Sequence, residues 1–362
     1  MGLPKIAAFL CIIICIGCDP LVTVFEDVED PVNYTAKTFV EPASVDTITI
    51  MTWNIRFGAA RLPWFGDSCG DRVMLTEAEV FDGLEKLAVR INDIDPDIIF
   101  LQEVDVESKR TQYIDQAQWL LNQTDLNYGV YASMWQAQFI PSDGLGRMDN
   151  GNAILSKWPI TDAERIQLPL RGDMDALTKY FYLRRNVIKA RIEIPGTDNV
   201  YAVGIHSSAF ATDDTKQKQI NKYIEILDDI NSSGGVFISG GDLNAIPPTA
   251  TKTDYCIEDA CDDEDFHSDG DDHREGSYFT PEKTWLEDLY EKYSPAVSLT
   301  EYSKIQHEAQ YFTHTPDWNG DWDRKLDYLW TNTDWVSGSD STLQEAVEAS
   351  DHVAVIAHWE VP

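Results

Sequence analysis

The sequence predicts a layered α/β protein. Short apolar stretches typical of buried strands alternate along the chain with two amphipathic stretches of helical periodicity. Several of the apolar stretches end in a polar residue able to bind a metal ion or a phosphate group. In layered α/β proteins the rigid sheet positions such residues, so functional sites gather at strand ends. The sequence contains no internal repeat and no second linker, and we expect one catalytic domain over residues 47–362.

Residues 1–17 have the pattern of a signal peptide. Lys5 is their one charged residue, and the apolar run over residues 6–16 is too short to span a bilayer comfortably. The Gly17-Cys18 pair resembles the lipobox of bacterial lipoproteins, although Cys15 stands where leucine is usual. We expect cleavage to leave an acylated Cys18, which would anchor an exported protein in the bacterial cell envelope. An ordinary cleaved signal and an uncleaved anchor are the alternatives.

Residues 18–46 are expected to form an acidic tether between the lipidated cysteine and the domain, because they contain three prolines and no sustained period. The whole chain carries 28 basic and 62 acidic residues, a formal net charge of −34. This charge disfavours unassisted binding to a polyanion, and a metal ion would have to supply positive charge at the site. The expected partners are a phosphoester substrate and, through the lipid, a membrane; nucleic acid is disfavoured, and we expect a monomer.

The elements are predicted in the following order. An alternating strand from Thr47 to Trp53 ends at Asn54, and a capping box at residues 76–79 begins a helix that Asp95-Pro96-Asp97 ends. The short apolar strand over residues 98–101 follows. Further strands are expected over residues 186–194, 200–205, 236–238, 328–330 and 353–359, with a second amphipathic helix over residues 216–230.

Four predicted strands run into a polar residue: Asn54, Glu103, His206 and Asp242. Asn244 lies two residues beyond Asp242, and residues two apart on an extended segment face the same way. A carboxylate and an amide at this spacing can address one phosphate group: the carboxylate aligns or deprotonates water, and the amide donates hydrogen bonds to oxygen. An Asx turn is the alternative interpretation of this Asp-x-Asn segment.

Further candidates lie near the C-terminus. Asp351 and His352 precede the last predicted strand and point to opposite faces, so each needs its own partner. Asp327, before the strand over residues 328–330, could orient His352 by accepting a hydrogen bond from its ring, as in the base–orienter pairs of hydrolases. Five other histidines have no motif around them and are expected to be structural or solvent-facing: His267, His273, His307, His314 and His358.

The segment over residues 254–275 is expected to be a solvated surface insertion. It holds eleven acidic residues and one arginine. Its start resembles an EF-hand, but Gly276 stands at the twelfth position, where glutamate is required, so a weak Ca²⁺ site is only the alternative. Cys256 and Cys261 are separated by four residues in this polar loop, and in an exported protein we expect them to form a small disulfide.

Seven segments of the chain, in this order, resemble those of a known family: Thr52–Asn54, Leu101–Glu103, Gly151–Ser156, Gly204–His206, Gly241–Asn244, Lys325–Tyr328 and Ser350–His352. The family is the endonuclease/exonuclease/phosphatase superfamily, which includes pancreatic-type deoxyribonucleases, abasic-site endonucleases, bacterial sphingomyelinases and inositol polyphosphate 5-phosphatases. The resemblance implies a four-layer α/β sandwich, in which two packed mixed β-sheets are flanked by helices.

The resemblance also implies the role of each catalytic residue. Asp242 would align the attacking water and Asn244 would bind the phosphate. His352, held by Asp327, would be the base or a phosphate ligand. His206 would bind the phosphate or assist the leaving group, although the family's usual Thr-His-Leu is here Ile-His-Ser.

By the same resemblance, Asn54 and Glu103 would hold a catalytic Mg²⁺ or Mn²⁺ ion, with Asp351 contributing; Mg²⁺ prefers such oxygen ligands. The predicted function is therefore a metal-dependent phosphodiesterase or phosphatase that acts on a small or membrane-presented phosphoester by in-line attack of water. A secreted nuclease of the same fold is one alternative, but the sequence lacks the basic stripes that such an enzyme would need. A catalytically inactive surface-binding lipoprotein is the other, and the complete set of site residues argues against it.

Overall fold

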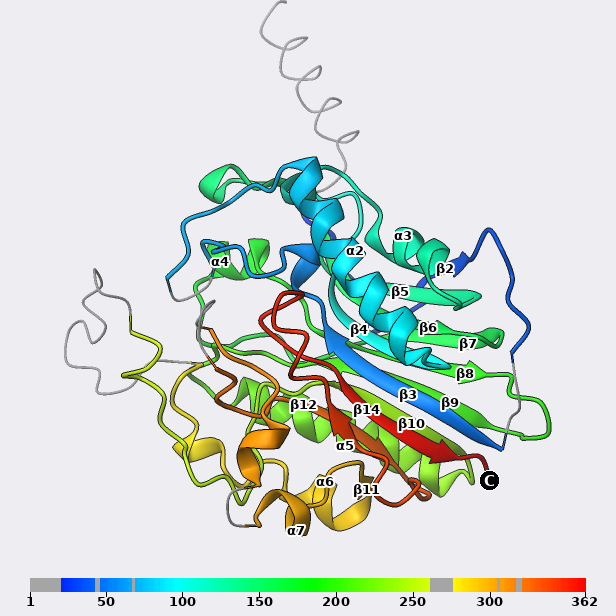
Figure 1. Ribbon diagram of the computed structural model, residues 1–362. Helices are drawn as coiled ribbons and strands as arrows, with labels where there is room; N and C mark the ends of the chain where they lie inside the picture. The colour runs from blue at the N-terminus through cyan, green and yellow to red at the C-terminus, as the bar shows by residue number, and fades with distance from the viewer. Residues whose placement is uncertain (1–20, 43–45, 67–68, 261–275, 305–306, 317–320) are drawn as a thin grey trace, which may run out of the picture.

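The computed structural model describes residues 21–42, 46–66, 69–260, 276–304, 307–316 and 321–362. Two seven-stranded mixed sheets pack against each other, and helices cover their outer faces (Figure 1). This arrangement confirms the predicted α/β sandwich of two mixed sheets flanked by helices.

In spatial order the first sheet contains β13 (Ser341–Thr342), β14 (Val355–Glu360), β3 (Thr47–Asn54), β4 (Ile98–Asp105), β6 (Gly146–Ser156), β5 (Tyr128–Ile140) and β2 (Val32–Thr35). The second sheet contains β1 (Val28–Glu29), β7 (Ile160–Gln167), β8 (Asn186–Ile192), β9 (Val200–His206), β10 (Val236–Asp242), β12 (Asp327–Thr331) and β11 (Ser294–Pro295). One parallel pair lies at the centre of each sheet, β3 with β4 and β9 with β10. Because the two strands of each pair run in the same direction, their carboxyl ends lie side by side at the same end of the sheet.

The α-helices are α2 (Glu77–Ile94), α3 (Gln116–Gln123), α4 (Ala176–Phe181), α5 (Thr215–Ser232), α6 (Glu287–Lys292) and α7 (Leu299–Tyr302). Short 3₁₀ helices lie at Arg56–Gly58, Lys109–Thr111, Ser142–Gly144, Thr280–Glu282 and Glu308–Tyr311. The predicted capping box is present at the start of α2: the Thr76 hydroxyl accepts from the Glu79 amide, and the Glu79 carboxylate accepts from the Thr76 amide. Such reciprocal bonds satisfy two donors that a helix start would otherwise leave unpaired.

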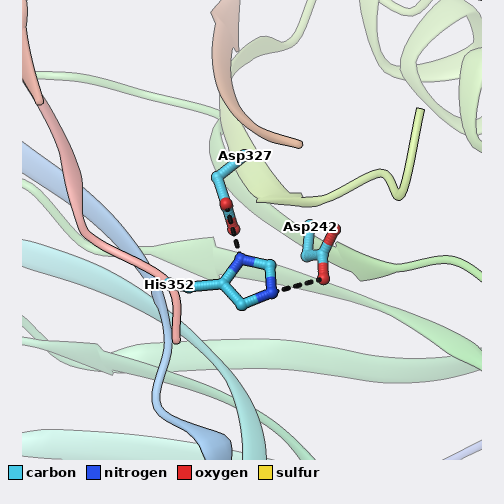
Figure 2. Close-up of side chains that lie close together, drawn as sticks. All are labelled: Asp242, Asp327 and His352. Carbon is cyan, nitrogen blue, oxygen red and sulfur yellow. Dashed lines mark hydrogen bonds and ion pairs between the residues drawn. The ribbon is translucent and has the colours of Figure 1, made fainter. Parts of the chain in front are cut away.

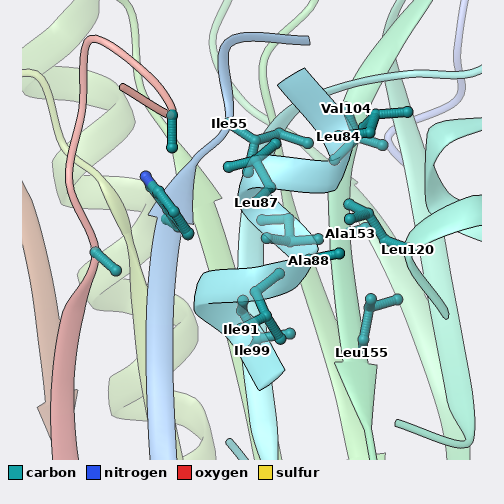
Figure 3. Packing of buried hydrophobic residues seen from close by; sticks show 14 of the residues in the cluster. Ile55, Leu84, Leu87, Ala88, Ile91, Ile99, Val104, Leu120, Ala153 and Leu155 are labelled. Atoms are coloured by element: carbon teal, nitrogen blue, oxygen red, sulfur yellow. The ribbon is translucent and has the colours of Figure 1, made fainter. Parts of the chain in front are cut away.

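Three apolar layers hold the sandwich together. Between the sheets, side chains such as Ile50 and Phe100 of the first sheet meet Ile188 and Ile238 of the second. On the outer face of the first sheet, α2 and α3 bury their apolar sides against β3, β4 and β6, as the packing of Leu84 and neighbouring residues shows (Figure 3). On the outer face of the second sheet, α5 packs against β9, β10 and β12. Because β4 and β10 are covered on both faces, their apolar runs over residues 98–101 and 236–238 are continuous, as the sequence indicated.

The N-terminal segment differs from the predicted tether. β1 pairs with β7 at one edge of the second sheet, and β2 pairs with β5 at one edge of the first. Val22 is only 1% exposed and forms a bridge with Ala137. The domain therefore begins well before residue 47, because short polar segments with no period of their own gain backbone partners at the two sheet edges. The predicted signal peptide and Cys18 lie outside the described residues.

The predicted disulfide between Cys256 and Cys261 is wrong. Cys256 carries a thiol that is 2% exposed, whereas Cys69 is disulfide-bonded. The Cys256 side chain is buried, and its neighbour Tyr255 belongs to a small hydrophobic cluster. Most of the acidic insertion, residues 261–275 with its candidate Ca²⁺ site, lies outside the described residues. No helix in the described part of the chain is long and apolar enough to cross a membrane.

One buried ion pair beside the helix-covered face of the first sheet is a candidate for a large contribution to stability. The Asp105 carboxylate is fully buried and accepts hydrogen bonds from Arg110 Nε and Nη2, both at 2.8 Å. Thr111 Oγ1 and Asn150 Nδ2 donate to the same carboxylate at 2.9 and 2.8 Å. The Arg110 guanidinium also lies over the Phe57 ring, 3.5 Å from its centroid. All the lone pairs and the charge of Asp105 are thus compensated inside the protein.

Replacing Arg110 with alanine is expected to lower the free energy of unfolding by about 3–5 kcal/mol, because it leaves a buried carboxylate without its counter-charge. Urea denaturation followed by circular dichroism measures this loss. Arg90→Ala is the matched control: its ion pair with Glu348 is partly exposed, and its removal should cost less than about 1 kcal/mol. Equal losses in the two variants would contradict the assignment.

Candidate active site

The carboxyl ends of the central parallel strands of both sheets meet at one end of the sandwich. In the second sheet, Asp242 is opposite His206 of the parallel strand β9 and opposite Asp327 of the antiparallel strand β12. In the first sheet, Asn54 ends β3 and its side chain donates to Asp242 Oδ2 across the sandwich at 3.2 Å. The register of the strands therefore brings residues from distant parts of the sequence to one place.

Asp242 lies at the centre of this group and is 1% exposed. Its Oδ2 lies 3.2 Å from Asn244 Nδ2, 3.4 Å from His206 Nε2 and 3.7 Å from His352 Nε2. Its Oδ1 accepts from the Asn244 amide at 2.8 Å, so the Asx turn is formed together with the predicted convergence of the two side chains. Burial raises the pKa of Asp242, and the positive charge on His352 opposes the rise. A carboxylate of raised pKa is suited to accept a proton near neutral pH.

His352 and Asp327 form the expected hydrogen bond. His352 Nδ1 donates to Asp327 Oδ2 at 2.8 Å, which leaves Nε2 facing Asp242 (Figure 2). Burial alone would lower the pKa of His352, but the charges of Asp327 and Asp242 outweigh it and raise the pKa to about 10. The imidazole is therefore a cation held in one orientation, ready to donate a hydrogen bond from Nε2.

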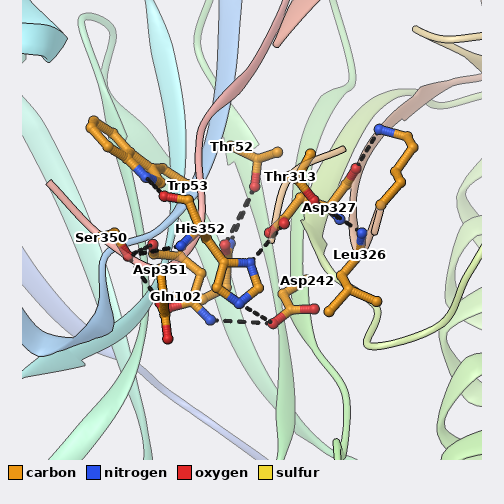
Figure 4. A network of polar contacts seen from close by, with 12 residues as sticks. Thr52, Trp53, Gln102, Asp242, Thr313, Leu326, Asp327, Ser350, Asp351 and His352 are labelled. Atoms are coloured by element: carbon orange, nitrogen blue, oxygen red, sulfur yellow. Dashed lines mark hydrogen bonds and ion pairs between the residues drawn. The ribbon is translucent and has the colours of Figure 1, made fainter. Parts of the chain in front are cut away.

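Backbone contacts hold this pair in place. Trp53 Nε1 donates to the His352 carbonyl at 2.9 Å, and Ser350 Oγ donates to the Asn54 carbonyl at 2.9 Å (Figure 4). The Thr313 hydroxyl accepts from the Asp327 amide at 3.2 Å. Trp53 of β3 and side chains of two loops thus fix the positions of His352 and Asp327.

Glu103 reaches the site through an irregularity in β4. The register between β4 and β6 shifts between Leu101 and Val104, and Glu103 has a φ of 58°. Such a bulge turns a side chain out of the regular alternation, and left-handed backbone at a non-glycine residue is typical of functional sites. Glu103 Oε1 accepts from Asn54 Nδ2 at 3.3 Å and lies 4.0 Å from His206 Nε2.

Asp351 is a further acidic residue in the wall of the pocket. It lines the same pocket as Glu103, and its Oδ2 lies 3.1 Å from Arg56 Nε. Glu103 and Asp351 offer carboxylate oxygens, which fit a hard divalent cation. The amide oxygen of Asn54, the third predicted ligand, accepts from the Arg56 amide at 3.1 Å, and its Nδ2 faces Glu103 and Asp242. Asp242, Asp327 and His352 also offer ligand atoms within 4.8 Å of one another. Because Asp327 and His352 are hydrogen-bonded to each other, and because His352 offers a nitrogen atom, we interpret these three residues as a group that shares a proton and not as a second metal site.

The sequence analysis missed several residues of the pocket wall, two arginines among them. Arg185 is 7% exposed and lines the pocket, and its Nε has no hydrogen-bond partner among the described residues. Burial lowers the pKa of Arg185, and the charges of Tyr182, Glu103 and Asp242 oppose the fall. Arg56 also lines the pocket. No motif marks either arginine, and the one available signal was that Arg56 follows Asn54 by two residues.

His314, which was expected to be structural or solvent-facing, is buried in the wall of the pocket. Its ring centroid lies 4.5 Å from that of His352, and both rings line the pocket. The cause is a backbone bridge between His314 and His352, which no local pattern announces. Burial lowers the pKa of His314 well below its usual value. By contrast, His307 and His358 contact Glu301 and Thr49 away from the pocket, while His267 and His273 lie outside the described residues.

Apolar side chains form the rest of the wall. Phe57, Trp64, Phe210 and Leu326 line the pocket beside the polar residues. Phe65, the neighbour of Trp64 in the sequence, packs on a separate small cluster. The pocket therefore combines an acidic and cationic floor with an apolar rim. A buried histidine–carboxylate pair, a second carboxylate and a buried guanidinium facing one pocket are the components of a hydrolytic site for an anionic ester.

Comparison with known proteins agrees with this class. The family model described as "Endonuclease/Exonuclease/phosphatase family" matches residues 51–352. A solved endonuclease/exonuclease/phosphatase from Beutenbergia cavernae is 18% identical, with a TM-score of 0.56 over 88% of this chain and 72% of that one. A solved AP endonuclease from Archaeoglobus fulgidus is 13% identical, with a TM-score of 0.51 over 87% of this chain and 100% of that one. No match was found among curated protein sequences.

The chain belongs to the endonuclease/exonuclease/phosphatase family. It is accordingly a phosphoester hydrolase, as the predicted segments indicated. The two solved structures, which are 18% and 13% identical, share the fold of this chain.

Proposed function

We propose that the protein is a Mg²⁺- or Mn²⁺-dependent hydrolase of a small or membrane-presented phosphoester, with water as the nucleophile. The observation that carries the proposal is the convergence of all eight predicted residues. Six of them line one pocket, and the other two, Asn54 and Asp327, are hydrogen-bonded to members of that set. A random set of strand-end residues would not meet in this way.

Asn54, Glu103 and Asp351 would hold the metal ion. When bound, the ion would neutralise charge on the phosphoryl oxygens and so stabilise the transition state. Its charge would also offset the mutual repulsion between these carboxylates and an incoming phosphate. The contact between Asp351 and Arg56 keeps that carboxylate in the pocket wall.

The remaining residues of the site would handle the phosphate group and the proton. Asp242 would align the attacking water and accept its proton, because its carboxylate is buried and has a raised pKa. His352 would donate from Nε2 to a phosphoryl oxygen, with Asp327 holding the ring. Arg185 would donate to another phosphoryl oxygen, which supplies the partner that Arg185 Nε lacks among the described residues. Asn244 Nδ2 donates to the Ser207 carbonyl at 3.1 Å and to Asp242 Oδ2 at 3.2 Å, and one of these bonds would be exchanged for a bond to a phosphoryl oxygen.

His206 would act as a neutral hydrogen-bond donor. Burial lowers its pKa well below the usual value, and the positive charges of Arg185 and His352 lower it further. With Nε2 facing Asp242 and Glu103, the ring carries its proton on that nitrogen. This position suits a contact with a phosphoryl or leaving-group oxygen.

An assay panel tests this function. We expect hydrolysis of at least one of bis-p-nitrophenyl phosphate, sphingomyelin, inositol phosphates and plasmid DNA in Mg²⁺, loss of turnover in EDTA, and recovery when Mg²⁺ or Mn²⁺ is restored. We expect plasmid DNA to be the poorest substrate at low salt, because the chain carries a net charge of −34. Full turnover in EDTA, or no hydrolysis of any substrate, would contradict the proposal.

We further propose that the protein is exported and anchored in the bacterial cell envelope through an acylated Cys18. The apolar run followed by Gly17-Cys18 supports this. Mass spectrometry of the mature N-terminal peptide is expected to find a lipid-modified cysteine, and Cys18→Ser to leave precursor or to release protein from the membrane. A free N-terminus at any other residue would refute the anchor.

A further inference from the structure

Lys216 is a buried lysine that contacts the active-site loop and that the proposed chemistry does not use. It lies in the first turn of α5, and its side chain is 1% exposed. Its Nζ donates to the Glu282 carboxylate at 2.6 Å and to the backbone carbonyl of Asn244 at 2.7 Å. The same atom lies 5.2 Å from the centroid of the Phe279 ring and 5.9 Å from that of Trp285. Two hydrogen bonds and two aromatic rings thus hold the ammonium group.

Stability alone does not account for the ion pair between Lys216 and Glu282. The Glu282 side chain is 11% exposed, and burial raises the pKa of its carboxyl group while the charge of Lys216 opposes the rise. The cost of removing two charges from water offsets much of their attraction, and an apolar pair of similar size often stabilises a fold as well. The bond from Lys216 to the Asn244 carbonyl is the contact that an apolar side chain could not make.

The backbone of Asn244 is in the left-handed region, with a φ of 46°. Asparagine adopts this conformation more readily than most residues, but it persists only where neighbouring groups hold it. On the N-terminal side of the turn, the Asn244 amide donates to Asp242 Oδ1 at 2.8 Å. On the C-terminal side, the direction of the Asn244 carbonyl sets the ψ angle, and Lys216 donates to that carbonyl. The turn is therefore held from both sides.

Side chains from three separate parts of the chain hold three successive carbonyls of this turn. The Leu243 carbonyl accepts from the Ser207 hydroxyl. The Ala245 carbonyl accepts from the Tyr328 hydroxyl at 2.7 Å. Lys216 donates to the carbonyl between them and is the one charged donor of the three. Charge-assisted hydrogen bonds are about twice as strong as neutral ones, so Lys216 contributes most to holding the turn.

The backbone of Asn244 determines where its side chain lies. Asn244 lines the pocket, and its Nδ2 points back across the turn to Asp242 Oδ2 and the Ser207 carbonyl. Because the next residue is held by Tyr328, a change in the ψ angle of Asn244 has to move the Cα atom and the side chain of Asn244. The bond from Lys216 therefore fixes the position of Nδ2 in the pocket.

We propose that Lys216 is a positioning residue for Asn244: its ammonium group fixes the left-handed turn, so that Asn244 Nδ2 reaches a phosphoryl oxygen of the substrate. Glu282 supplies the counter-charge of the buried ammonium group. The role of Asn244 at the phosphate rests on the proposed function, whereas the hold of Lys216 on the turn does not.

Hydrogen–deuterium exchange, resolved to single amides in the full-length chain, tests the hold on the turn without turnover. Lys216→Met/Glu282→Gln removes both charges, whereas Glu282→Gln alone keeps the donor to the Asn244 carbonyl. We expect the Asn244 amide to exchange about tenfold faster or more in the double variant than in Glu282→Gln and in the wild-type chain. The amide of Ile238, fully buried in β10, is the reference for global unfolding. Equal exchange of the Asn244 amide in all three chains, or an equal acceleration at Ile238, overturns the proposal.

Turnover of bis-p-nitrophenyl phosphate in Mg²⁺ tests whether the turn serves the Asn244 side chain. The double variant is expected to lose about tenfold or more in kcat/KM. Lys218→Met is the matched control and should keep the wild-type rate, because Lys218 lies on the same helix but is 58% exposed and paired with Asp214.

The Asn244→Ala background separates positioning from a general loss of structure. In that background the double variant should lose less than about threefold more, because the group that Lys216 positions is already absent. Equal losses in the two backgrounds overturn the positioning role. An Asn244→Ala variant with the wild-type rate would instead contradict the proposed function of Asn244 and leave the exchange result standing.

Discussion

Replacing Glu103 with alanine is expected to lower kcat/KM on bis-p-nitrophenyl phosphate in Mg²⁺ by about a thousandfold or more. A metal ion that clamps phosphate contributes several kcal/mol to the stability of the transition state, and Glu103, which the β4 irregularity turns into the pocket, is the proposed charged ligand. The same variant should need much higher Mg²⁺ for half-maximal rate. Steady-state kinetics over a range of Mg²⁺ concentrations measures both effects.

Glu107→Ala is the matched control. Glu107 lies four residues further along, also has left-handed backbone with a φ of 54°, and is paired with Arg147 at the surface. Its removal should leave kcat/KM within about twofold, because exposed ion pairs contribute little. A Glu103→Ala variant within about threefold of wild type would show that the metal is held elsewhere or is not needed.

Removing His352 or Asp327 is expected to lower kcat by about 10²–10⁴-fold, with the double variant little worse than the worse single one. The two residues share a 2.8 Å hydrogen bond in a buried setting, and groups that act as one unit are far from additive. Asp327→Asn and His352→Ala, alone and combined, form the double-mutant cycle. Single-turnover kinetics would separate the chemical step from product release.

Unfolding midpoints serve as the control for this cycle, because Asp327 is fully buried and its replacement also affects packing. Thermal unfolding should show whether each variant is folded at the assay temperature. Strictly multiplicative losses in kcat among folded variants would mean that Asp327 and His352 act separately.

Much of the fold and most of the residues at the centre of the site could be predicted from the sequence, because the relevant signals are local. An apolar run such as residues 98–101 is recognisable as a buried strand from its own residues. The capping box at Thr76 begins a helix through hydrogen bonds within four residues. The polar residues that follow such runs lie where the strand ends or, for Glu103, at the bulge inside β4. By contrast β5, β6 and β7 received no strand prediction. The sequences of β6 and β7 carry many polar residues, and β6 is nevertheless buried because it pairs between β4 and β5.

The features that only the tertiary structure decided depend on contacts between distant residues. The bridge that places His314 against His352 joins two loops, and Arg185 enters the pocket because β8 pairs beside β9. The N-terminal segment became part of the domain because two sheet edges offered it backbone partners. The sequence by itself determined which residues can carry the chemistry, since residue type and strand periodicity are local. Which cations and rings surround them was decided by strand order and register, which arise from long-range packing and leave no local pattern.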